Sequence, residues 1–512
     1  MIQQRLGTKI FVIVPILLFF SAFGIFSYNL DQMPWIGDEV TYFYPAFVNY
    51  FELILQGDLF NECWKDKIFC DDPDRLSGLR IGKPVEPNRP MSQEAWQSLP
   101  PLVPILLAGT SFNLFGDNDD PTFSYENLTA ARLVSPILGA LIVVFVFYIG
   151  KLLFNNFVGI SFALLVLFHG LIIFNSRLIM LEIFAHFLLI FSFLLFVKSI
   201  SDGKINLKIL LFSAVLCSLG LMTKFYEVVA LVPIVIILII LRNDFRKKID
   251  KHLIRNRFFT NSLPISLLFC VIIACVFFIP QPFFWDQPIE QLNVLRDSVN
   301  VYAPFHPPFS PEIQPHYNVG AIVSATIAPI ADLYCYNFSD DCPNFGGPGN
   351  TVISNFSTVP LTILFIIGIG FLAVDLRKKN FEFSKLILVS WYFLTFLMLA
   401  LTIDSYQYDR YWIGLFFPMM FIASYGTYRL TKNLNKFTTF TFVAVSILTH
   451  ALSIFIFWEI LYAGPTVALT PPFPISLQES ITIPLIYSFN IIFCIFAGGL
   501  IIKNLRKQSI SN

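Results

Sequence analysis

Long apolar runs separated by polar segments fill most of this chain, and each run approaches the length that an α-helix needs to cross a membrane, which is about 20 residues. The runs lie at residues 10–30, 131–150, 157–174, 178–197, 207–222, 226–241, 261–280, 360–375, 384–402, 411–428, 438–458 and 483–502. They predict about 12 transmembrane helices, roughly 10–14. The apolar stretch 102–115 is shorter and predicts an interfacial or re-entrant helix.

The polar segments predict the orientation of the chain. Short loops rich in Lys and Arg tend to face the cytoplasm. With the N-terminus inside, most of the 34 Lys and Arg residues fall in inner segments such as 242–257 and 429–436, and most of the 34 Asp and Glu residues fall outside. We therefore expect both termini in the cytoplasm and two long outer loops, about 31–130 and about 281–359.

Composition agrees with a membrane protein. Hydrophobic residues make up 56% of the chain and charged residues 13%, and the mean hydropathy is +0.69. A soluble domain usually carries about 25% charged residues. The formal net charge is +0, so nothing suggests nucleic acid as a partner. We expect an all-α polytopic protein of the plasma membrane or an equivalent membrane, with a transmembrane core over 1–436 and further transmembrane helices over 437–512.

The segment PWIGDEVTYFYPAF, residues 34–47, places two adjacent carboxylates just beyond the first apolar run. Asp38 and Glu39 stand among aromatic residues, including Trp35 and Tyr42, and such residues gather at membrane interfaces. One interpretation is a solvated pair in a loop. The other is a short interfacial helix that presents the two carboxylates to a substrate at the membrane surface.

Four cations stand at or near the outer ends of apolar runs, namely Arg132, Arg177, Lys224 and Arg410. Charges are costly at such positions and tend to face a cavity or a partner. As a set, these cations could hold a phosphate group. Singly, each could extend to the membrane surface or form an ion pair, as Lys224 could with Glu227.

Several motifs follow one another between residues 30 and 430, namely GDEVTY, LPPLVPILLAGTSFNLFGDN, ENLTAARLVSPILGALIVVFVFYIGKLLF, NSRLIMLEIFAHF, LGLMTKFYEVVAL and DRYWIGLFFPMM. In these motifs and their order, the chain resembles the integral-membrane glycosyltransferases of the GT-C superfamily, in the branch of protein O-mannosyltransferases and aminoarabinose transferases. Two positions depart from that pattern. Ser98-Leu99 precede Pro-Pro where the family often has His or an acidic residue, and Glu182 replaces a frequent Asp.

The resemblance implies a GT-C-like helical bundle that moves a sugar at the outer face. The donor would be a polyprenyl- or dolichyl-phosphate-linked sugar, and the acceptor a hydroxyl on a protein, a glycan or a lipid. No cofactor is clearly required, although a divalent metal occurs in some relatives. His306 and His316, in the second outer loop, lack the close spacing of metal ligands.

The resemblance also implies roles for single residues. Asp38 would act as the general base in a direct displacement that inverts the anomeric centre, as carboxylates do elsewhere in sugar chemistry. Glu39 would position the acceptor or help to bind a metal. The four cations would hold the phosphate and offset its developing charge. The substrate contacts would come from Tyr42, Glu182 and Tyr411.

Two alternative functions are a transporter, which belongs to another class, and a different kind of glycosyltransferase. A transporter or flippase of lipid-linked saccharides would also need outer cations, but transporters commonly carry internal repeats and midplane sites, and no repeat occurs here. An oligosaccharyltransferase would need a large C-terminal outer domain, whereas only the short loop 459–482 is expected outside after residue 430.

Two pairs of cysteines with the same spacing lie in the expected outer loops, Cys63 with Cys70 and Cys335 with Cys342. An oxidising exterior favours disulfides, and free thiols are the alternative. We expect the bonds Cys63–Cys70 and Cys335–Cys342, which mass mapping of non-reduced peptides would detect. Four free thiols at these positions would contradict the expectation, whereas pairing between the loops would change only the connectivity.

Overall fold

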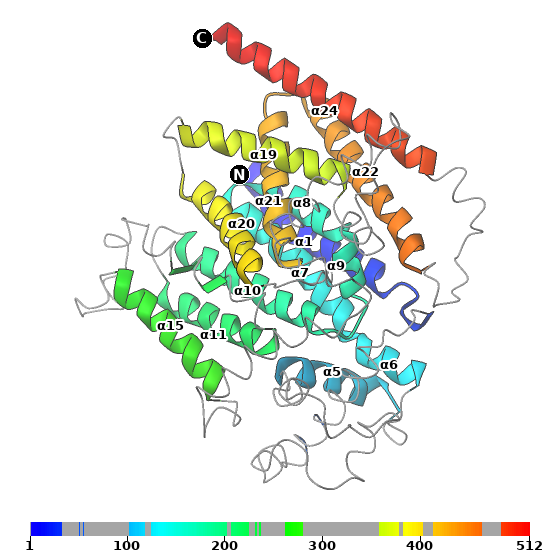
Figure 1. Cartoon of the computed structure of the whole chain (residues 1–512), viewed down its shortest axis with the longest axis vertical. Helices are drawn as coiled ribbons and strands as arrows, with labels where there is room; N and C mark the ends of the chain where they lie inside the picture. The colour runs from blue at the N-terminus through cyan, green and yellow to red at the C-terminus, as the bar shows by residue number, and fades with distance from the viewer. Residues whose placement is uncertain are drawn as a thin grey trace, which may run out of the picture.

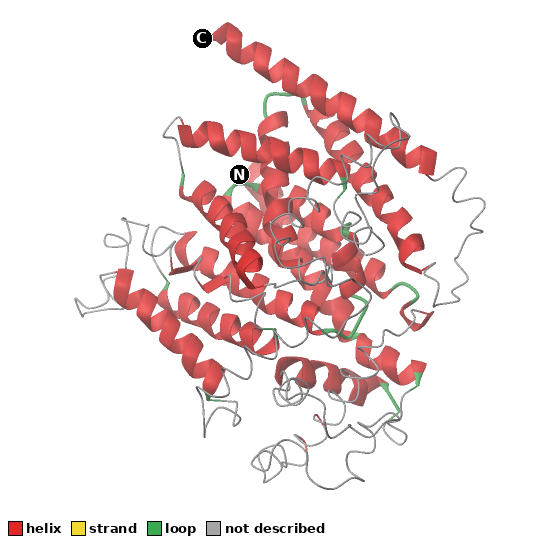
Figure 2. Cartoon of the chain, in the orientation of Figure 1, coloured by secondary structure: helices red, strands yellow, loops and turns green. Residues whose placement is uncertain are grey.

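The computed structural model of the chain describes residues 2–32, 102–117, 124–201, 206–224, 262–279, 358–377, 382–402, 413–462 and 483–511, with single positions at 51, 55, 231, 232, 235 and 236. All regular structure in these residues is helical (Figures 1 and 2). The all-α class expected from the sequence is therefore confirmed for the described part of the chain.

The longer helices are α1 (Ile2–Ser27), α7 (Val134–Leu153), α10 (Leu181–Ser201), α11 (Leu207–Thr223), α15 (Ser262–Phe278), α19 (Val359–Arg377), α20 (Phe383–Thr402), α21 (Ile413–Thr431), α22 (Lys436–Tyr462) and α24 (Ile483–Ser511). Each coincides with one of the apolar runs of the sequence. The run 226–241 lies almost entirely outside the described residues. By length and composition, two described segments could cross a membrane, 125–153 and 181–200, and further apolar helices are shorter.

The shorter elements are η1 (Leu30–Gln32), α5 (Leu102–Phe115), α6 (Tyr125–Arg132), α8 (Asn156–Leu167) and α9 (Gly170–Asn175). The helix α5 has the bounds that the apolar stretch predicts. It lies beside α6 at one edge of the molecule (Figure 1) and contacts α7, α10 and α11 as well. Its interfacial placement stays a prediction.

The core of the bundle lies where α8, α10, α20 and α21 meet. Trp391 of α20 packs against Phe193 of α10 with ring centroids 4.2 Å apart. Phe162 of α8 stacks on Phe421 of α21 at 4.8 Å, and Trp391 contacts both of these rings edge-on. Such aromatic pairs add about 0.5–1.5 kcal/mol each beyond the area that they bury. This cluster joins the helices α8 and α10 to the later helices α20 and α21.

Glycines allow α19 and α21 to approach closely. A Cβ atom at Gly426 would lie 2.6 Å from the carbonyl oxygen of Leu364, and one at Gly368 would lie 2.3 Å from that of Ile422. Small residues at helix contacts are typical of membrane bundles, where tight packing replaces the hydrophobic effect between helices. Any larger residue at either glycine would separate the two helices.

The structure differs from the sequence expectation at the run 157–174, which forms two helices instead of one. After α8, the backbone N–H of His169 bonds to Val166 O at 3.2 Å, so the carbonyl of Leu165 has no helical donor. The Nε2–H of His450, on α22, donates to Leu165 O at 3.1 Å. The Nδ1 of the same ring accepts from the hydroxyl of Thr358, which precedes α19, at 2.6 Å. A carbonyl without a hydrogen bond is unfavourable away from water, and His450 supplies the hydrogen bond at this break.

An ion network holds the opposite end of the bundle from Arg132. Phe154, directly after α7, contacts the ring of Tyr425 at 5.0 Å, and Tyr425 donates a 2.7 Å hydrogen bond to Asp375. Arg132 stands just before α7, and 20 helical residues span about 30 Å. We refer to these two regions as the Arg132 end and the Asp375 end of the bundle.

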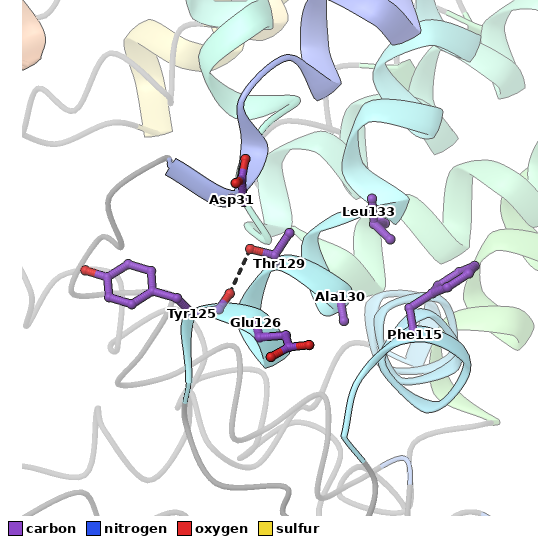
Figure 3. Close-up of a pocket in the computed structure, with 7 residues that line it drawn as sticks. All are labelled: Asp31, Phe115, Tyr125, Glu126, Thr129, Ala130 and Leu133. Carbon is purple, nitrogen blue, oxygen red and sulfur yellow. Dashed lines mark hydrogen bonds between the residues drawn. The ribbon is translucent and has the colours of Figure 1, made fainter.

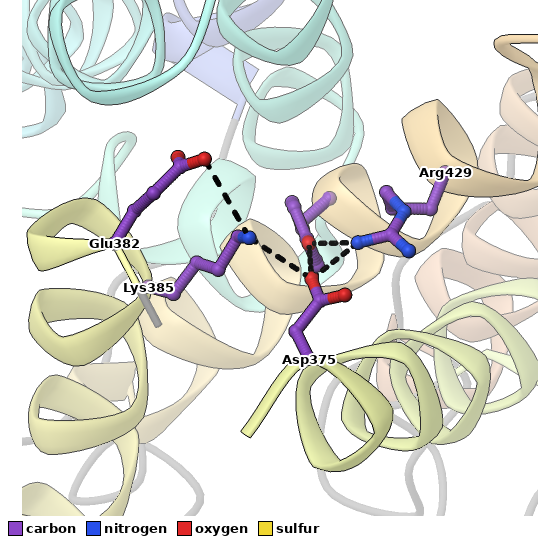
Figure 4. Close-up of polar contacts among 5 residues, drawn as sticks. Asp375, Glu382, Lys385 and Arg429 are labelled. Atoms are coloured by element: carbon purple, nitrogen blue, oxygen red, sulfur yellow. Dashed lines mark hydrogen bonds and ion pairs between the residues drawn. The ribbon is translucent and has the colours of Figure 1, made fainter. Parts of the chain in front are cut away.

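At the Asp375 end, one carboxylate joins three helices (Figure 4). Asp375 of α19 accepts from Lys385 of α20 at 3.1 Å, and from both Tyr425 and Arg429 of α21. Arg429 also donates to the hydroxyl of Tyr425 at 2.6 Å. Glu382, by contrast, is 64% exposed and lies 3.8 Å from Lys385.

We expect Asp375→Asn to destabilise the protein by about 2–3 kcal/mol, because Lys385 and Arg429 would lose their shared counter-ion. This is less than the ~3–5 kcal/mol for a fully buried pair, since Arg429 remains partly exposed. Thermal unfolding in detergent measures the change. The control Glu382→Gln removes an exposed carboxylate and should cost less than about 1 kcal/mol. Equal melting of the two variants would show that Asp375 does not hold the helices together.

Candidate functional site

Arg177 holds the end of the first helix. It lies between α9 and α10 and is 6% exposed. Its Nη2 donates to the carbonyl oxygens of Tyr28 at 2.7 Å and Asn29 at 3.1 Å. The last carbonyls of a helix have no partner within the helix, and a cation at this end also interacts favourably with the helix dipole. Arg177 thus supplies hydrogen-bond donors to carbonyls at the end of α1 and places a positive charge at the negative end of the helix dipole.

The chain turns at this point. Asn29 has φ of 48°, in the left-handed region, which asparagine tolerates and which commonly terminates helices. The 3-10 turn η1 follows and ends at Gln32. Asp38 and Glu39 come shortly afterwards in the sequence. Arg177 therefore fixes the point from which the segment with the two carboxylates departs.

A buried ion pair lies across the neighbouring helices α10 and α11. The Nζ of Lys224 is 2.7 Å from Oε1 of Glu182, and the two side chains are 8% and 3% exposed. Glu182 stands in the first turn of α10 and Lys224 caps the C-terminus of α11. Each charge is thus favoured by the dipole of its own helix. Both residues were singled out from the sequence as separate substrate contacts, and the structure brings them together.

The first turn of α21 lies next to this pair. One turn beyond Glu182, Nδ1 of His186 donates to the carbonyl oxygen of Glu182 at 2.7 Å. A Cβ atom at Gly414 would lie 3.8 Å from Nε2 of His186. The beginning of α21, which follows Arg410 and Tyr411 in the sequence, is therefore close to the Glu182–Lys224 pair.

Arg132 is the last residue of α6 and is only 1% exposed. The helix α6 begins after Ser124, whose hydroxyl accepts from the backbone N–H of Asn127 at 3.1 Å as an N-cap. The hydroxyl of Ser111 on α5 donates to Ala130 O at 2.6 Å and ties α5 to α6. These bonds fix the corner between α5 and α6 at which Arg132 is buried.

A pocket of about 340 Å³ opens between η1, α5 and α6 (Figure 3). Its lining residues are Asp31, Phe115, Tyr125, Glu126, Thr129, Ala130 and Leu133. Asp31 and Glu126 come from different elements, and no ion-pair partner of either occurs among the described residues. The pocket thus brings two carboxylates to the Arg132 end of the bundle.

Other residues that the sequence analysis singled out lie outside the described residues. These are Asp38, Glu39, Tyr42, Arg410, Tyr411, Cys63, Cys70, Cys335 and Cys342. Their roles stay predictions. Within the described part, no group of three or more His, Cys, Asp or Glu residues could hold a metal ion.

The sequence did not predict the pocket or the hydrogen bond from His186 to the carbonyl oxygen of Glu182. No motif marks Asp31, Phe115 or Glu126, and Asp31 is far from the other two in the chain. Only the fold brings η1 to the corner of α5 and α6. One signal was present, because Ser124 directly before Tyr125 and Glu126 is a helix N-cap pattern and places both of them in an exposed first turn. His186 lies one turn after Glu182, and that spacing indicates a shared helix face.

Comparison with known proteins supports the resemblance drawn from the motifs. Residues 94–287 match the family model of the dolichyl-phosphate-mannose-protein mannosyltransferases, a range that contains Arg132, Arg177, Glu182 and Lys224. This match confirms the resemblance to GT-C glycosyltransferases over that range. No curated protein sequence matches the chain.

Among solved structures, the chain is similar to the archaeal oligosaccharyltransferase AglB from Archaeoglobus fulgidus, in complex with an inhibitory peptide and a dolichol-phosphate. The TM-score is 0.37 and the sequence identity 14%, and the match covers 77% of this chain and 47% of that one. The chain therefore spans about half the length of that structure.

We expect Arg177→Met to destabilise the protein by about 3 kcal/mol, because two hydrogen bonds from a charged donor are lost and each contributes about 1.5–3 kcal/mol. Arg177→Lys, which keeps the charge but not the planar fork of donors, should cost less. Thermal unfolding measures both changes. Arg377→Met, which removes an exposed arginine at the end of α19, is the matched control and should stay within about 0.5 kcal/mol. Equal melting of Arg177→Met and this control would show that the hydrogen bonds from Arg177 to the end of α1 do not stabilise the protein.

Proposed function

We propose that the chain is a membrane glycosyltransferase that moves a sugar from a polyprenyl- or dolichyl-phosphate-linked donor to an acceptor hydroxyl. The observation that carries this proposal is that Arg177 and the Glu182–Lys224 pair lie at the same end of the bundle as Arg132. All four residues lie within the range that matches the mannosyltransferase family model. Charges at the ends of apolar helices tend to face a cavity or a partner, and the phosphate of a lipid donor lies at the membrane surface, where these helices end.

The donor phosphate would lie between Lys224 and Arg132. The contact with Glu182 orients the ammonium of Lys224, which has three N–H donors and would donate one of them to a phosphate oxygen. Arg410 would approach with the start of α21, which lies near His186. Positive charge at this position stabilises the negative charge that develops on the leaving oxygen. Glu182 would thus contribute by holding the ammonium of Lys224 in place, and Tyr411 by contacting the sugar.

Asp38 would supply the base. Asp38 lies six positions after Gln32 in the chain, a length that reaches at most about 20–22 Å, so the carboxylate would stay in the neighbourhood of the Arg132 end. The acceptor oxygen would attack the anomeric carbon and lose its proton to Asp38. The bond from that carbon to the phosphate oxygen would break, and the polyprenyl phosphate would leave with the electron pair. One displacement of this kind inverts the anomeric centre. Glu39 and Tyr42 would align the acceptor.

The outer face of the membrane is the proposed side of transfer, with both termini in the cytoplasm. The support is the distribution of charge along the chain, since basic residues concentrate in the short loops opposite to this site. Accessibility tagging of residues 60–90 from each side of sealed vesicles tests this orientation. Tagging from the cytoplasmic side would reverse it.

One observation is of the kind that transporters show, namely the break between α8 and α9. The carbonyl that the break frees is already bonded to His450, and Leu165, Val166 and Leu167 before it are buried apolar residues. The charged residues instead stand at helix ends, with Glu182 in the first turn of α10 and Lys224 at the end of α11. This arrangement supports the enzyme more than a midplane transport site.

The purified protein, incubated with a panel of labelled polyprenyl-phosphate sugars and candidate acceptors, tests the proposal. We expect Asp38→Asn to lower the rate of transfer by about 10²–10⁴-fold without loss of donor binding, which is the usual contribution of a general base. Lys224→Ala should weaken donor binding as well as the rate, because its charge acts in the ground state too.

Asp58→Asn changes another carboxylate of the same outer loop and serves as the matched control, with melting measured for every variant. Near-normal turnover by Asp38→Asn would remove Asp38 as the base and make Glu39 the next candidate. Full activity in a variant of Asp38 and in a variant of Glu39 would indicate that the two carboxylates are a solvated pair in a loop.

A further inference from the structure

The pocket between η1, α5 and α6 offers hydrogen-bond acceptors and negative charge. Asp31 and Glu126 are exposed carboxylates, and neither has an ion-pair partner among the described residues. The hydroxyl of Thr129 donates its hydrogen to Tyr125 O at 2.7 Å, so its oxygen can only accept from a ligand. Among the described residues that line the pocket, two are carboxylates and none is cationic. This part of the lining favours a cation over an anion.

Aromatic rings flank these carboxylates. In Figure 3, Tyr125 and Phe115 stand on opposite sides of Glu126, and the two residues are 52% and 64% exposed. An ammonium or guanidinium group gains energy over an aromatic face as well as beside a carboxylate. Large exposed aromatic residues beside a concave site are typical of binding surfaces. The lining thus combines the two kinds of group that recognise Lys and Arg side chains.

The size and position of the pocket narrow the ligand further. About 340 Å³ lies near the lower limit of small-molecule sites, roughly 300–1,000 Å³, so the pocket can hold one extended side chain but no folded partner. The two carboxylates of the described lining disfavour the phosphate of the donor and favour a cationic group of the acceptor. Polypeptides present such cations on Lys and Arg, whereas glycans without free amines and uncharged lipids do not.

We propose that this pocket binds a Lys or Arg side chain of a polypeptide acceptor, and so selects hydroxyls that lie close to a basic residue. The inference rests on the proposed glycosyltransferase function and adds the class of acceptor to it. Asp31 precedes the segment with Asp38 and Glu39 by only a few residues. A side chain held in the pocket would therefore anchor the acceptor beside the proposed base.

A series of threonine peptides tests the inference. The peptides are identical except for one position, occupied by Lys, norleucine or Glu and moved along the sequence around the threonine. We expect the Lys peptides to exceed the norleucine peptides in kcat/KM by about three- to tenfold at the favoured position, in line with ion pairs and cation–π contacts at partly exposed sites. Asp31→Asn and Glu126→Gln should each reduce this ratio toward one.

Charge reversal gives a sharper result. Glu126→Lys should favour the Glu peptide over the Lys peptide, with melting measured to show that α6 is intact. Glu382→Gln, an exposed carboxylate of the Asp375 end, is the matched control and should leave the peptide preference unchanged. Equilibrium binding of the same peptides, measured without any donor, repeats the comparison independently of transfer.

The outcomes separate the two proposals. Transfer to peptides without a charge preference, or a preference that survives both pocket variants, overturns the pocket assignment and leaves the glycosyltransferase function standing. A charge preference in binding without transfer from any lipid-linked donor supports the pocket and contradicts the function. If saccharide acceptors are used and the pocket variants raise their KM, the site binds a glycan, and the polypeptide assignment is wrong.

Discussion

The two hydrogen bonds from Arg177 to the carbonyl oxygens of Tyr28 and Asn29 are the contact on which the proposed site depends most. They join the end of the first helix to the connection between α9 and α10, across a separation of about 150 residues in the sequence. Because Asn29 turns the chain directly after α1, these bonds determine where the following segment begins. They also hold the end of α1 beside the connection that leads into α10, the helix that carries Glu182.

The other charges of the Arg132 end share one physical arrangement with Arg177. Glu182 lies at a helix N-terminus, and Lys224 at a helix C-terminus, so each is stabilised by its own helix before any ligand is bound. This solves the problem of keeping ions in an apolar bundle. It also gives a reason for an anionic lipid headgroup to bind here, since the cations are already fixed in position and lose little freedom on binding. At the Asp375 end, Lys385 and Arg429 are instead neutralised by a shared carboxylate.

The sequence predicted the helices well because membrane spans are long and almost uniformly apolar. It also predicted that Arg177 and Lys224 stand at or near helix ends, since each interrupts or borders such a run. It did not predict that Lys224 would pair with Glu182, 42 residues away, because the nearer Glu227 offered an equally plausible partner in sequence. The break between α8 and α9 was not predicted for a similar reason. The free carbonyl of Leu165 is bonded by His450 of α22, and only the packed structure brings that helix to Leu165.

On this proposal, the Arg132 end of the bundle holds the phosphate of a lipid-linked donor. The most direct test uses a polyprenyl phosphate with a photoreactive group next to the phosphate, crosslinked to the protein in lipid nanodiscs and mapped by mass spectrometry. We expect labelled peptides around Arg132, Arg177 and Lys224, and loss of the label when unlabelled polyprenyl phosphate is added in excess. Specific labelling confined to the Asp375 end, around Lys385 and Arg429, would contradict it.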